Sequence, residues 1–181
     1  NRADRPLGDR PVKSTRLDAP DPRPVFGVVC QVGASVCHVQ RTVVLRRAEK
    51  SLAELEVHTD LRSAKVAEIS GEPRVAIHVW DEKAHLQIRV KSVASVLSGE
   101  DAAGRFARVP EPARRVYGGI PDPGKVLASP ELHGASQDPA DHFAVLILQA
   151  VQIETLHLGQ DRHRRARFRA ADGWSGVWLA P

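Results

Sequence analysis

Short runs of apolar residues that alternate with polar ones recur along most of the chain. The run at 74–80 is the most regular, and it would place Val75, Ile77 and Val79 on one face because successive side chains of a strand point to opposite faces. Such runs predict six or seven β-strands when the C-terminal hairpin is counted as one. They cover residues 25–32, 39–46, 52–57, 74–80, 85–97 and 142–158, and the hairpin pairs 162–169 with 174–179.

Only short helices are predicted between these strands. One covers 61–69 and is ended by Gly71 and Pro73, and a second runs from Gly99 to about Arg108. A further helical turn is expected at 113–117, and the many Gly and Pro residues of 118–140 predict a loop. Because strands and helices do not alternate, a doubly wound parallel sheet is excluded. The pattern predicts a mainly β fold, an antiparallel Greek-key barrel, closed or partly open, with short inserted helices.

The composition indicates one globular domain that follows an irregular arm. Residues 1–24 are rich in Pro, Asp and Arg and predict a Pro/Arg-rich arm, so the domain is expected at 25–181. The 181 residues are 42% hydrophobic and 27% charged, and no apolar run approaches the roughly 18 residues of a membrane helix. With no secretory segment evident, we expect a cytoplasmic protein with Cys30 and Cys37 reduced. The formal net charge of +4 suits an anionic ligand.

The stretch 58–65 carries the densest set of anion-binding groups. A predicted strand leads there into a predicted helix start, whose first amides lack partners within the helix and favour negative charge. Asp60 is a possible helix cap, and a phosphate is the natural ligand of the remaining groups. An ordinary capped helix with a solvated basic face is the alternative. The donors are His58, Thr59, Arg62, Ser63 and Lys65.

Three other segments offer similar chemistry. The strand at 39–46 carries Arg41 and Arg46, and Gln87 stands in an otherwise apolar strand, where its amide needs either backbone or ligand partners. The strand at 162–169 places several cations on one face, which fits a phosphate-bearing ligand, a solvated edge or a nucleic-acid patch. That face consists of His163, Arg165, Arg167 and Arg169. The spacing of the eight histidines contains no metal-binding motif, and no nucleophile motif is found.

Taken in order, these segments resemble the pyridoxamine 5'-phosphate oxidase-like family of FMN-binding split barrels, in particular its oxidase-related branch. The resemblance covers about residues 25–181. The matching motifs are Arg-Thr-Val-Val-Leu-Arg at 41–46, His-Thr-Asp-x-x-Ser-x-Lys at 58–65, Pro-Arg-Val-Ala at 73–76, Leu-Gln-Ile-Arg at 86–89, and Arg-x-Phe followed by Trp-Leu-Ala-Pro at the C-terminus.

The resemblance implies an FMN site at the interface of a homodimer. Arg41 and Lys65 would contact the phosphate, with Ser63 beside them, and Arg62 would compensate for the family's arginine before Lys65. His58 and Thr59 would lie against the flavin. Gln87 and Arg167 would contact the ring, and His163 and Arg165 correspond to the substrate-binding segment. The strand that would line the isoalloxazine consists of Arg41, Thr42, Val43, Val44, Leu45 and Arg46.

This sequence matches the family's substrate-binding motifs less well than its flavin-binding motifs. The Arg-x-His that binds the vitamin phosphate falls on His163-Arg164-Arg165, in reversed order, and Ala64 replaces an arginine before Lys65. We therefore expect an FMN-dependent oxidoreductase with a small substrate other than pyridoxamine phosphate. Two alternatives remain, a module that binds flavin, haem or a deazaflavin without turnover, and a basic nucleic-acid-binding barrel.

Overall fold

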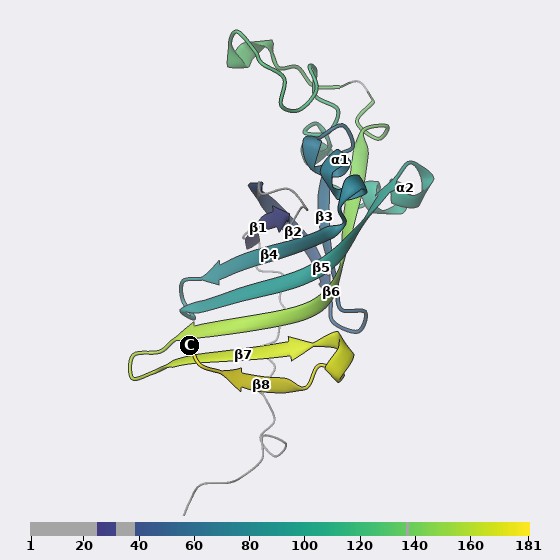
Figure 1. Cartoon of the computed structure of the whole chain (residues 1–181). Helices are drawn as coiled ribbons and strands as arrows, with labels where there is room; N and C mark the ends of the chain where they lie inside the picture. The colour runs from purple at the N-terminus through teal and green to yellow at the C-terminus, as the bar shows by residue number, and fades with distance from the viewer. Residues whose placement is uncertain (1–24, 32–38, 137) are drawn as a thin grey trace, which may run out of the picture.

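A computed structural model describes residues 25–31, 39–136 and 138–181 of the chain, so the predicted arm at 1–24 and Cys37 lie outside the described residues. The described part contains eight strands in one antiparallel sheet, one more than the upper predicted number, and a few short helices (Figure 1). The strands are β1 (Val25–Gln31), β2 (Gln40–Glu49), β3 (Glu54–Asp60), β4 (Arg74–Asp81), β5 (Leu86–Ser98), β6 (Phe143–Leu158), β7 (His163–Arg169) and β8 (Gly176–Leu179).

The strand order confirms the mainly β, antiparallel Greek-key fold. The sheet runs β3-β2-β1-β4-β5-β6-β7-β8, so β1, β2 and β3 are consecutive neighbours and β4 returns to the free side of β1. β3 also pairs with β6, which links the first six strands in a ring of pairings. β7 and β8 continue from the second half of β6, so they extend the sheet beyond that ring.

The sixteen-residue strand β6 joins these two parts of the sheet. Its first half lies between β3 and β5, with Val57 opposite Leu146, and its second half lies between β5 and β7, with Glu154 opposite Arg167. A register shift after Lys91 marks the point where β5 and β6 bend. The strand predicted at 142–158 is therefore confirmed as one long strand.

The helices are α1 (Ala64–Gly71), α2 (Glu100–Phe106) and α3 (Glu111–Arg114). The described part of the loop after α3 contains the 3-10 turn η2 (Pro130–Leu132) and an isolated antiparallel bridge between Ile120 and Gly134. The strand before α1 differs from its prediction. β3 begins at Glu54 and extends to Asp60, because its last residues pair with Ala144 and Phe143 of β6. Helix α1 consequently begins at Ala64, three residues later than predicted, and Asp60 is not its cap.

Two apolar clusters lie on opposite sides of the β3–β6 seam. The inner cluster contains Val57 and Leu148 and is covered at one end by Val66 and Ile69 of α1. The outer cluster contains Val145 and Phe143 and is covered by α2 and the segment after it. The alternation of β6 side chains explains this division, because neighbouring residues of one strand supply the two clusters in turn.

Two properties of the described residues bear on the class of protein. None of their helices has the length and apolar character of a membrane span. No group of three or more His, Cys, Asp or Glu side chains in this part of the chain is arranged to hold a metal ion.

Candidate functional site

The corner where β3 passes into α1 brings together four of the predicted FMN-binding residues. Lys65 Nζ donates a hydrogen bond of 2.7 Å to Thr59 Oγ1, which lies 3.3 Å from Ser63 Oγ. Arg41 reaches the same corner from β2, where its Nη2 lies 3.0 Å and 2.7 Å from the two carboxylate oxygens of Glu68. Strand alternation produces this convergence, because Thr59 and Arg41 point toward the barrel end that α1 covers.

The electrostatics of this corner favour an anion. Burial lowers the pKa of the Lys65 ammonium, and the nearby Arg41 guanidinium lowers it further. Among the described residues Lys65 has a hydroxyl as its hydrogen-bond partner and forms no ion pair within 4 Å. Ser63 occupies the N-cap position of α1 without making a side-chain cap bond, so the first amides of this eight-residue helix receive no cap from it. A bound anion would complement the lysine and these amides together.

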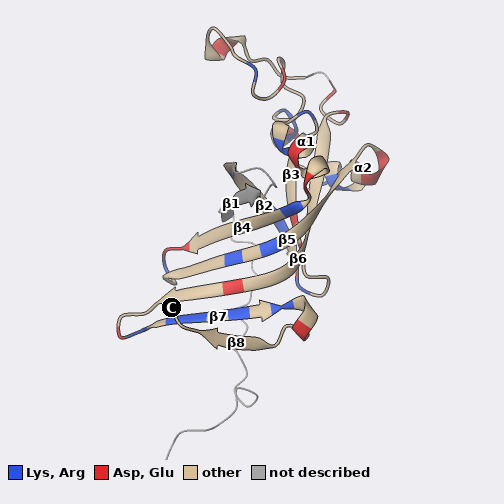
Figure 2. Ribbon diagram, viewed as in Figure 1, with Lys and Arg blue, Asp and Glu red and all other residues tan. Residues whose placement is uncertain are grey.

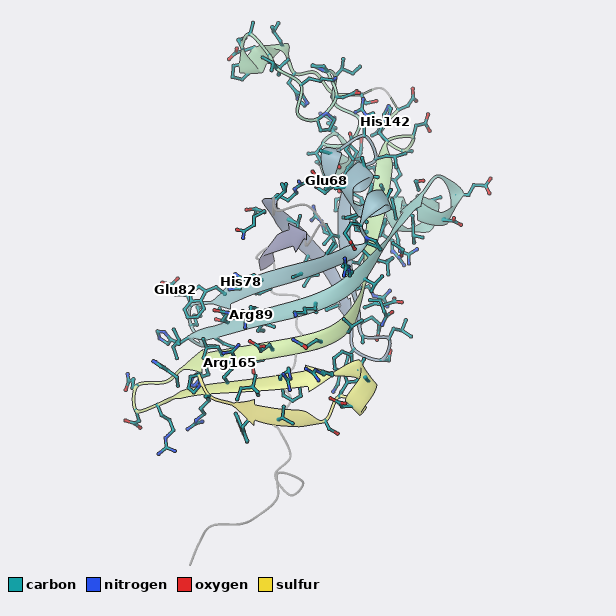
Figure 3. The ribbon with its side chains drawn as sticks, viewed as in Figure 1. Glu68, His78, Glu82, Arg89, His142 and Arg165 are labelled. Carbon is teal, nitrogen blue, oxygen red and sulfur yellow. The ribbon has the colours of Figure 1, made fainter. Side chains whose placement is uncertain are left out.

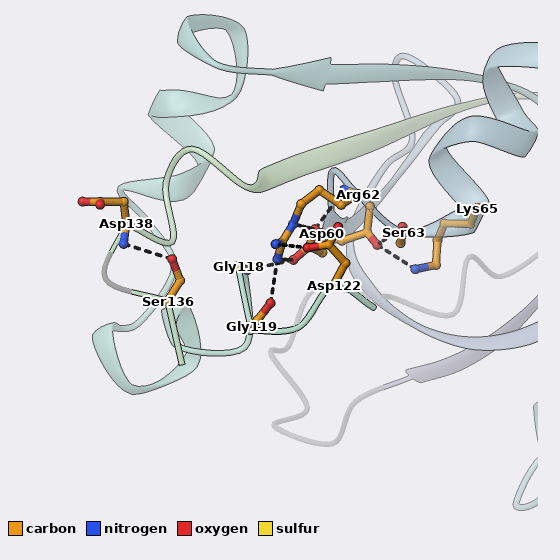
Figure 4. Close-up of polar contacts among 10 residues, drawn as sticks. Asp60, Arg62, Ser63, Lys65, Gly118, Gly119, Asp122, Ser136 and Asp138 are labelled. Atoms are coloured by element: carbon orange, nitrogen blue, oxygen red, sulfur yellow. Dashed lines mark hydrogen bonds and ion pairs between the residues drawn. The ribbon is translucent and has the colours of Figure 1, made fainter. Parts of the chain in front are cut away.

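Arg62 points into a different network from Lys65 (Figure 4). Its guanidinium donates to Asp60 Oδ1 at 3.1 Å and Oδ2 at 2.9 Å, and to the Gly119 carbonyl at 2.9 Å. Asp122 is a further partner. Asp60 also accepts the Gly118 amide at 2.7 Å. Burial raises the pKa of Asp60, but these hydrogen bonds outweigh it and hold the pKa below its usual value. Arg62 and Asp60 therefore attach the 118–122 loop to the end of β3.

The other β2 residues differ in exposure as alternation and barrel position require. Val43 is buried in the inner cluster, and Val44 and Leu45 are half-buried. Thr42 and Arg46 are exposed. These five residues line one strand, but of the predicted β2 ligands only Arg41 contacts the Lys65 corner through a described partner.

His58 belongs to a buried polar chain that the sequence analysis did not anticipate. His58 Nε2 lies 2.8 Å from Glu56 Oε1, and Glu56 Oε2 accepts a bond of 3.1 Å from Arg105 of α2. Burial lowers the pKa of His58 despite this carboxylate. Burial would raise the pKa of Glu56, but its two hydrogen bonds outweigh that effect and the pKa lies below its usual value. The pair is thus a neutral imidazole that donates to a carboxylate.

An aromatic group encloses this polar chain. The His58 and Tyr117 rings each meet the Phe143 ring edge-on with centroids 4.9 Å apart. Tyr117 is buried, and burial raises the pKa of its hydroxyl although the nearby Arg46 opposes the shift. The i, i+2 spacing of Glu56 and His58 was the available sequence signal, because it places both side chains on one face of a strand. Arg105, which comes from a remote helix, had no such signal.

Gln87, Arg165 and Arg167 lie on the outer face of the sheet formed by β4 to β8. Gln87 stands opposite Trp80 and Leu156, and Leu156 stands opposite Arg165. No side-chain hydrogen bond of Gln87 is found within the described residues. Figure 3 shows Arg165 with His78 and Arg89 along this face, and Figure 2 shows the Lys and Arg residues that cross β5 and β7.

One carboxylate serves several cations on this face. Glu154 accepts from Arg89 and from Arg165 Nε and Nη2, the latter two at 3.0 Å and 2.8 Å. Arg167 stands directly opposite Glu154, yet its buried Nε has no hydrogen-bond partner in the described structure. His163 is exposed at the start of β7. The predicted ligands therefore form two groups in this chain, one at the Lys65 corner and one on the outer face.

The ring of six paired strands with a Greek-key connection and two added strands is the architecture of a split barrel. Residues 32–98, just over a third of the chain, match the family model of the pyridoxamine 5'-phosphate oxidase FMN-binding domain. This match confirms the resemblance to that family, and it confirms FMN as the cofactor predicted from the resemblance. No curated protein matches the chain.

Solved structures of similar fold agree with this family. A pyridoxamine 5'-phosphate oxidase-related, FMN-binding protein from Nostoc punctiforme is 23% identical, with 86% of this chain and 88% of that one covered at a TM-score of 0.73. PhzG from Burkholderia lata, solved with tetrahydrophenazine-1-carboxylic acid, is 16% identical, with 87% and 83% covered at a TM-score of 0.66. General stress protein 26 from Bacillus anthracis is 12% identical, with 87% and 92% covered at 0.53. At these identities the likeness shows the fold alone.

Proposed function

We propose that the chain is an FMN-dependent oxidoreductase that acts on a small organic substrate. The observation that carries this proposal is the Lys65 corner, where two cations and two hydroxyls meet the start of a helix inside a fold that matches an FMN-binding family. Nothing in the described residues neutralises Lys65 within ion-pair distance, so the corner retains capacity for an anion.

The donors of this corner fit the phosphate of FMN. Lys65 would contribute a compact charge, and Arg41 would contribute the guanidinium N–H donors that do not contact Glu68. Ser63 and Thr59 would donate hydroxyl hydrogen bonds, and the first amides of α1 would add their dipoles. His58, held by Glu56, would lie toward the ring system together with the β2 backbone. Arg62 would act indirectly by fixing the 118–122 loop.

The outer face supports a homodimer in which a second copy completes the site. Gln87 and Arg167 would face the partner's flavin, where the amide and the unpartnered guanidinium nitrogen would find hydrogen-bond acceptors. Exposed apolar side chains accompany them, with Trp80 and Val177 each 45% exposed. Uncovered aromatic and aliphatic groups around such polar donors are typical of a surface that a partner covers. A symmetric dimer would contain two equivalent sites.

In this arrangement bound FMN would supply the hydride or electron transfer, and the protein would supply binding, orientation and charge. His163 and Arg165 would contact an anionic or polar group of the substrate, and Glu154 would fix the orientation of Arg165. We also propose that the protein acts in the cytoplasm. The alternative function that the same site allows is flavin binding without catalysis.

Three measurements on the purified full chain test this proposal. The absorbance spectrum, with mass analysis of the released ligand, should identify FMN, and light scattering during gel filtration should give the mass of a dimer. Anaerobic mixing with organic hydride donors should bleach the flavin. A protein that is colourless and takes up no added FMN would refute the proposal. A yellow protein whose flavin no donor reduces would leave only the binding module.

A further inference from the structure

A cavity of about 550 Å³ lies at the far end of the sheet, where the β4–β5 turn meets the β6–β7 turn. His85 comes from the first turn, His157 from the end of β6, and Arg162 and Arg164 from the second turn and the start of β7. The remaining lining residues are Leu158, Gly159, Gln160 and Asp161. None of these residues is among the predicted flavin or substrate ligands, although Arg164 lies between the predicted substrate ligands His163 and Arg165.

The backbone fixes the four cavity-lining basic groups, His85, His157, Arg162 and Arg164, close together. His157 and Arg164 stand directly opposite each other on β6 and β7, so their side chains share one face. That face is opposite to the one that carries Arg165, since adjacent residues of a strand alternate. The Leu158 amide donates to the His85 carbonyl at 2.9 Å, which ties the β4–β5 turn to the end of β6.

Both turns have an unusual backbone geometry beside the cavity. His85 has a φ of 47°, in the left-handed region that non-glycine residues rarely adopt. At Gly159 an added Cβ would lie 2.6 Å from the Arg162 carbonyl oxygen and 3.2 Å from the His157 ring. Only glycine therefore permits this close approach of the Arg162 backbone and the His157 ring.

The charges of the cavity are not balanced within the described structure. Arg162 and Arg164 form no side-chain hydrogen bond or ion pair with any described residue, and neither do the rings of His85 and His157. Asp161 is the one acidic residue of the lining. Arg162 and Arg164 are exposed, so solvent screens part of their mutual repulsion, and an anion bound between them would remove the rest. Some other arginines do have a carboxylate partner, as Arg89 and Arg165 have in Glu154.

We infer that this cavity is a binding site for a small organic anion that carries a phosphate or carboxylate group. Guanidinium groups bind both anions through paired, charge-assisted hydrogen bonds, and the imidazoles add donors at the rim. The volume accommodates a small molecule and exceeds what a single inorganic ion needs. This inference does not rest on the proposed function, because the cavity shares no residue with the Lys65 corner.

Inorganic phosphate serves as the probe for this site in the full-length protein. Histidine ring signals are followed by NMR during a phosphate titration, at constant ionic strength, with His85→Gln and His157→Gln variants to assign them. The two rings should shift together along one saturable curve. Arg164→Gln should weaken phosphate binding about tenfold, which corresponds to the loss of one charge-assisted hydrogen bond. Arg169→Gln is the matched control, since Arg169 is an exposed arginine of the same strand on the outer face.

The same titration, repeated with Lys65→Ala, distinguishes phosphate bound in the cavity from phosphate bound at the Lys65 corner. Lys65→Ala should leave the shifts of His85 and His157 unchanged, whereas FMN affinity reports on the Lys65 corner alone. The experiment can therefore refute anion binding in the cavity without bearing on the flavin proposal, and FMN titration can refute the flavin proposal without bearing on the cavity. Rings that do not move, movement that does not saturate, equal weakening by Arg169→Gln, or loss of the shifts in Lys65→Ala would each overturn the inference.

Discussion

Lys65 is the residue at which the flavin proposal makes its sharpest quantitative prediction. Its ammonium is half-buried, donates to Thr59 and forms no ion pair in the described structure. Replacing it with alanine should remove one charge-assisted hydrogen bond to the FMN phosphate, a loss of about 1.5–3 kcal/mol. The dissociation constant for FMN should therefore rise roughly ten- to a hundredfold.

Removing the Lys65 charge should weaken FMN binding, but it should not destabilise the ligand-free protein. The pKa of Lys65 is lowered by burial and by Arg41, so the folded state disfavours its charged form. Below the folded-state pKa this charge costs stability, and the cost is relieved as the pH rises toward the ordinary lysine value of 10.5. Lys65→Met removes the charge but keeps an apolar stem, so it should unfold at the same or a higher temperature than the wild type without FMN.

Fluorescence titration with FMN and thermal unfolding with and without FMN measure the two effects. Lys50→Ala is the matched control, because Lys50 is an exposed lysine in the turn between β2 and β3. FMN should stabilise the wild type and the control but much less the Lys65 variants. An unchanged dissociation constant in Lys65→Ala, or an equal loss in Lys50→Ala, would refute the assignment of Lys65 to the phosphate.

Two further predictions concern the networks around the site. Glu56→Gln should cost about 1–3 kcal/mol of stability, since it weakens the bonds to both His58 and Arg105, and urea unfolding measures this against the exposed control Glu100→Gln. Because the pKa of Glu56 is lowered from 4.5, the stability that the ionised carboxylate contributes should be lost as the pH falls through the folded-state pKa. The stability of Glu56→Gln should therefore depend less on pH in this acidic range. Asp60→Asn should release the 118–122 loop and accelerate proteolysis there, and unchanged cleavage would contradict the tethering.

The alternation of apolar residues was sufficient to predict most of the strands. β4 and β5 follow the predicted segments closely, because each has a regular period of two and is bounded by a turn of polar or glycine residues. β3 was misplaced by two to three residues. Leu52 belongs to the turn and is 56% exposed, whereas the polar Thr59 and Asp60 are buried at the end of the strand. Pairing with β6 decides these limits, and that pairing spans more than eighty residues of sequence.

The phosphate end of the site was largely predictable because its ligands stand close together in sequence. Thr59, Ser63 and Lys65 lie within seven residues, and the structure brings them within hydrogen-bonding reach of one another. Their electrostatic partners were not predictable. Glu68 pairs with Arg41 across 27 residues, and Arg105 pairs with Glu56 across 49. Such partners depend on helix placement, which the local pattern does not determine.

The pairing of Arg41 with Glu68 also bears on how an anion could bind beside an acidic residue. Glu68 contacts the guanidinium through Nη2 alone, at both carboxylate oxygens. A guanidinium carries five N–H donors in a fixed plane, so this contact orients the group without consuming its remaining donors. Asp60 acts to raise the pKa of Lys65 against the effects of burial and of Arg41, and so does Glu68, which lies three residues after Lys65 on α1. The carboxylate therefore lowers the cost of holding two cations together, and a dianionic phosphate would still meet a net positive corner.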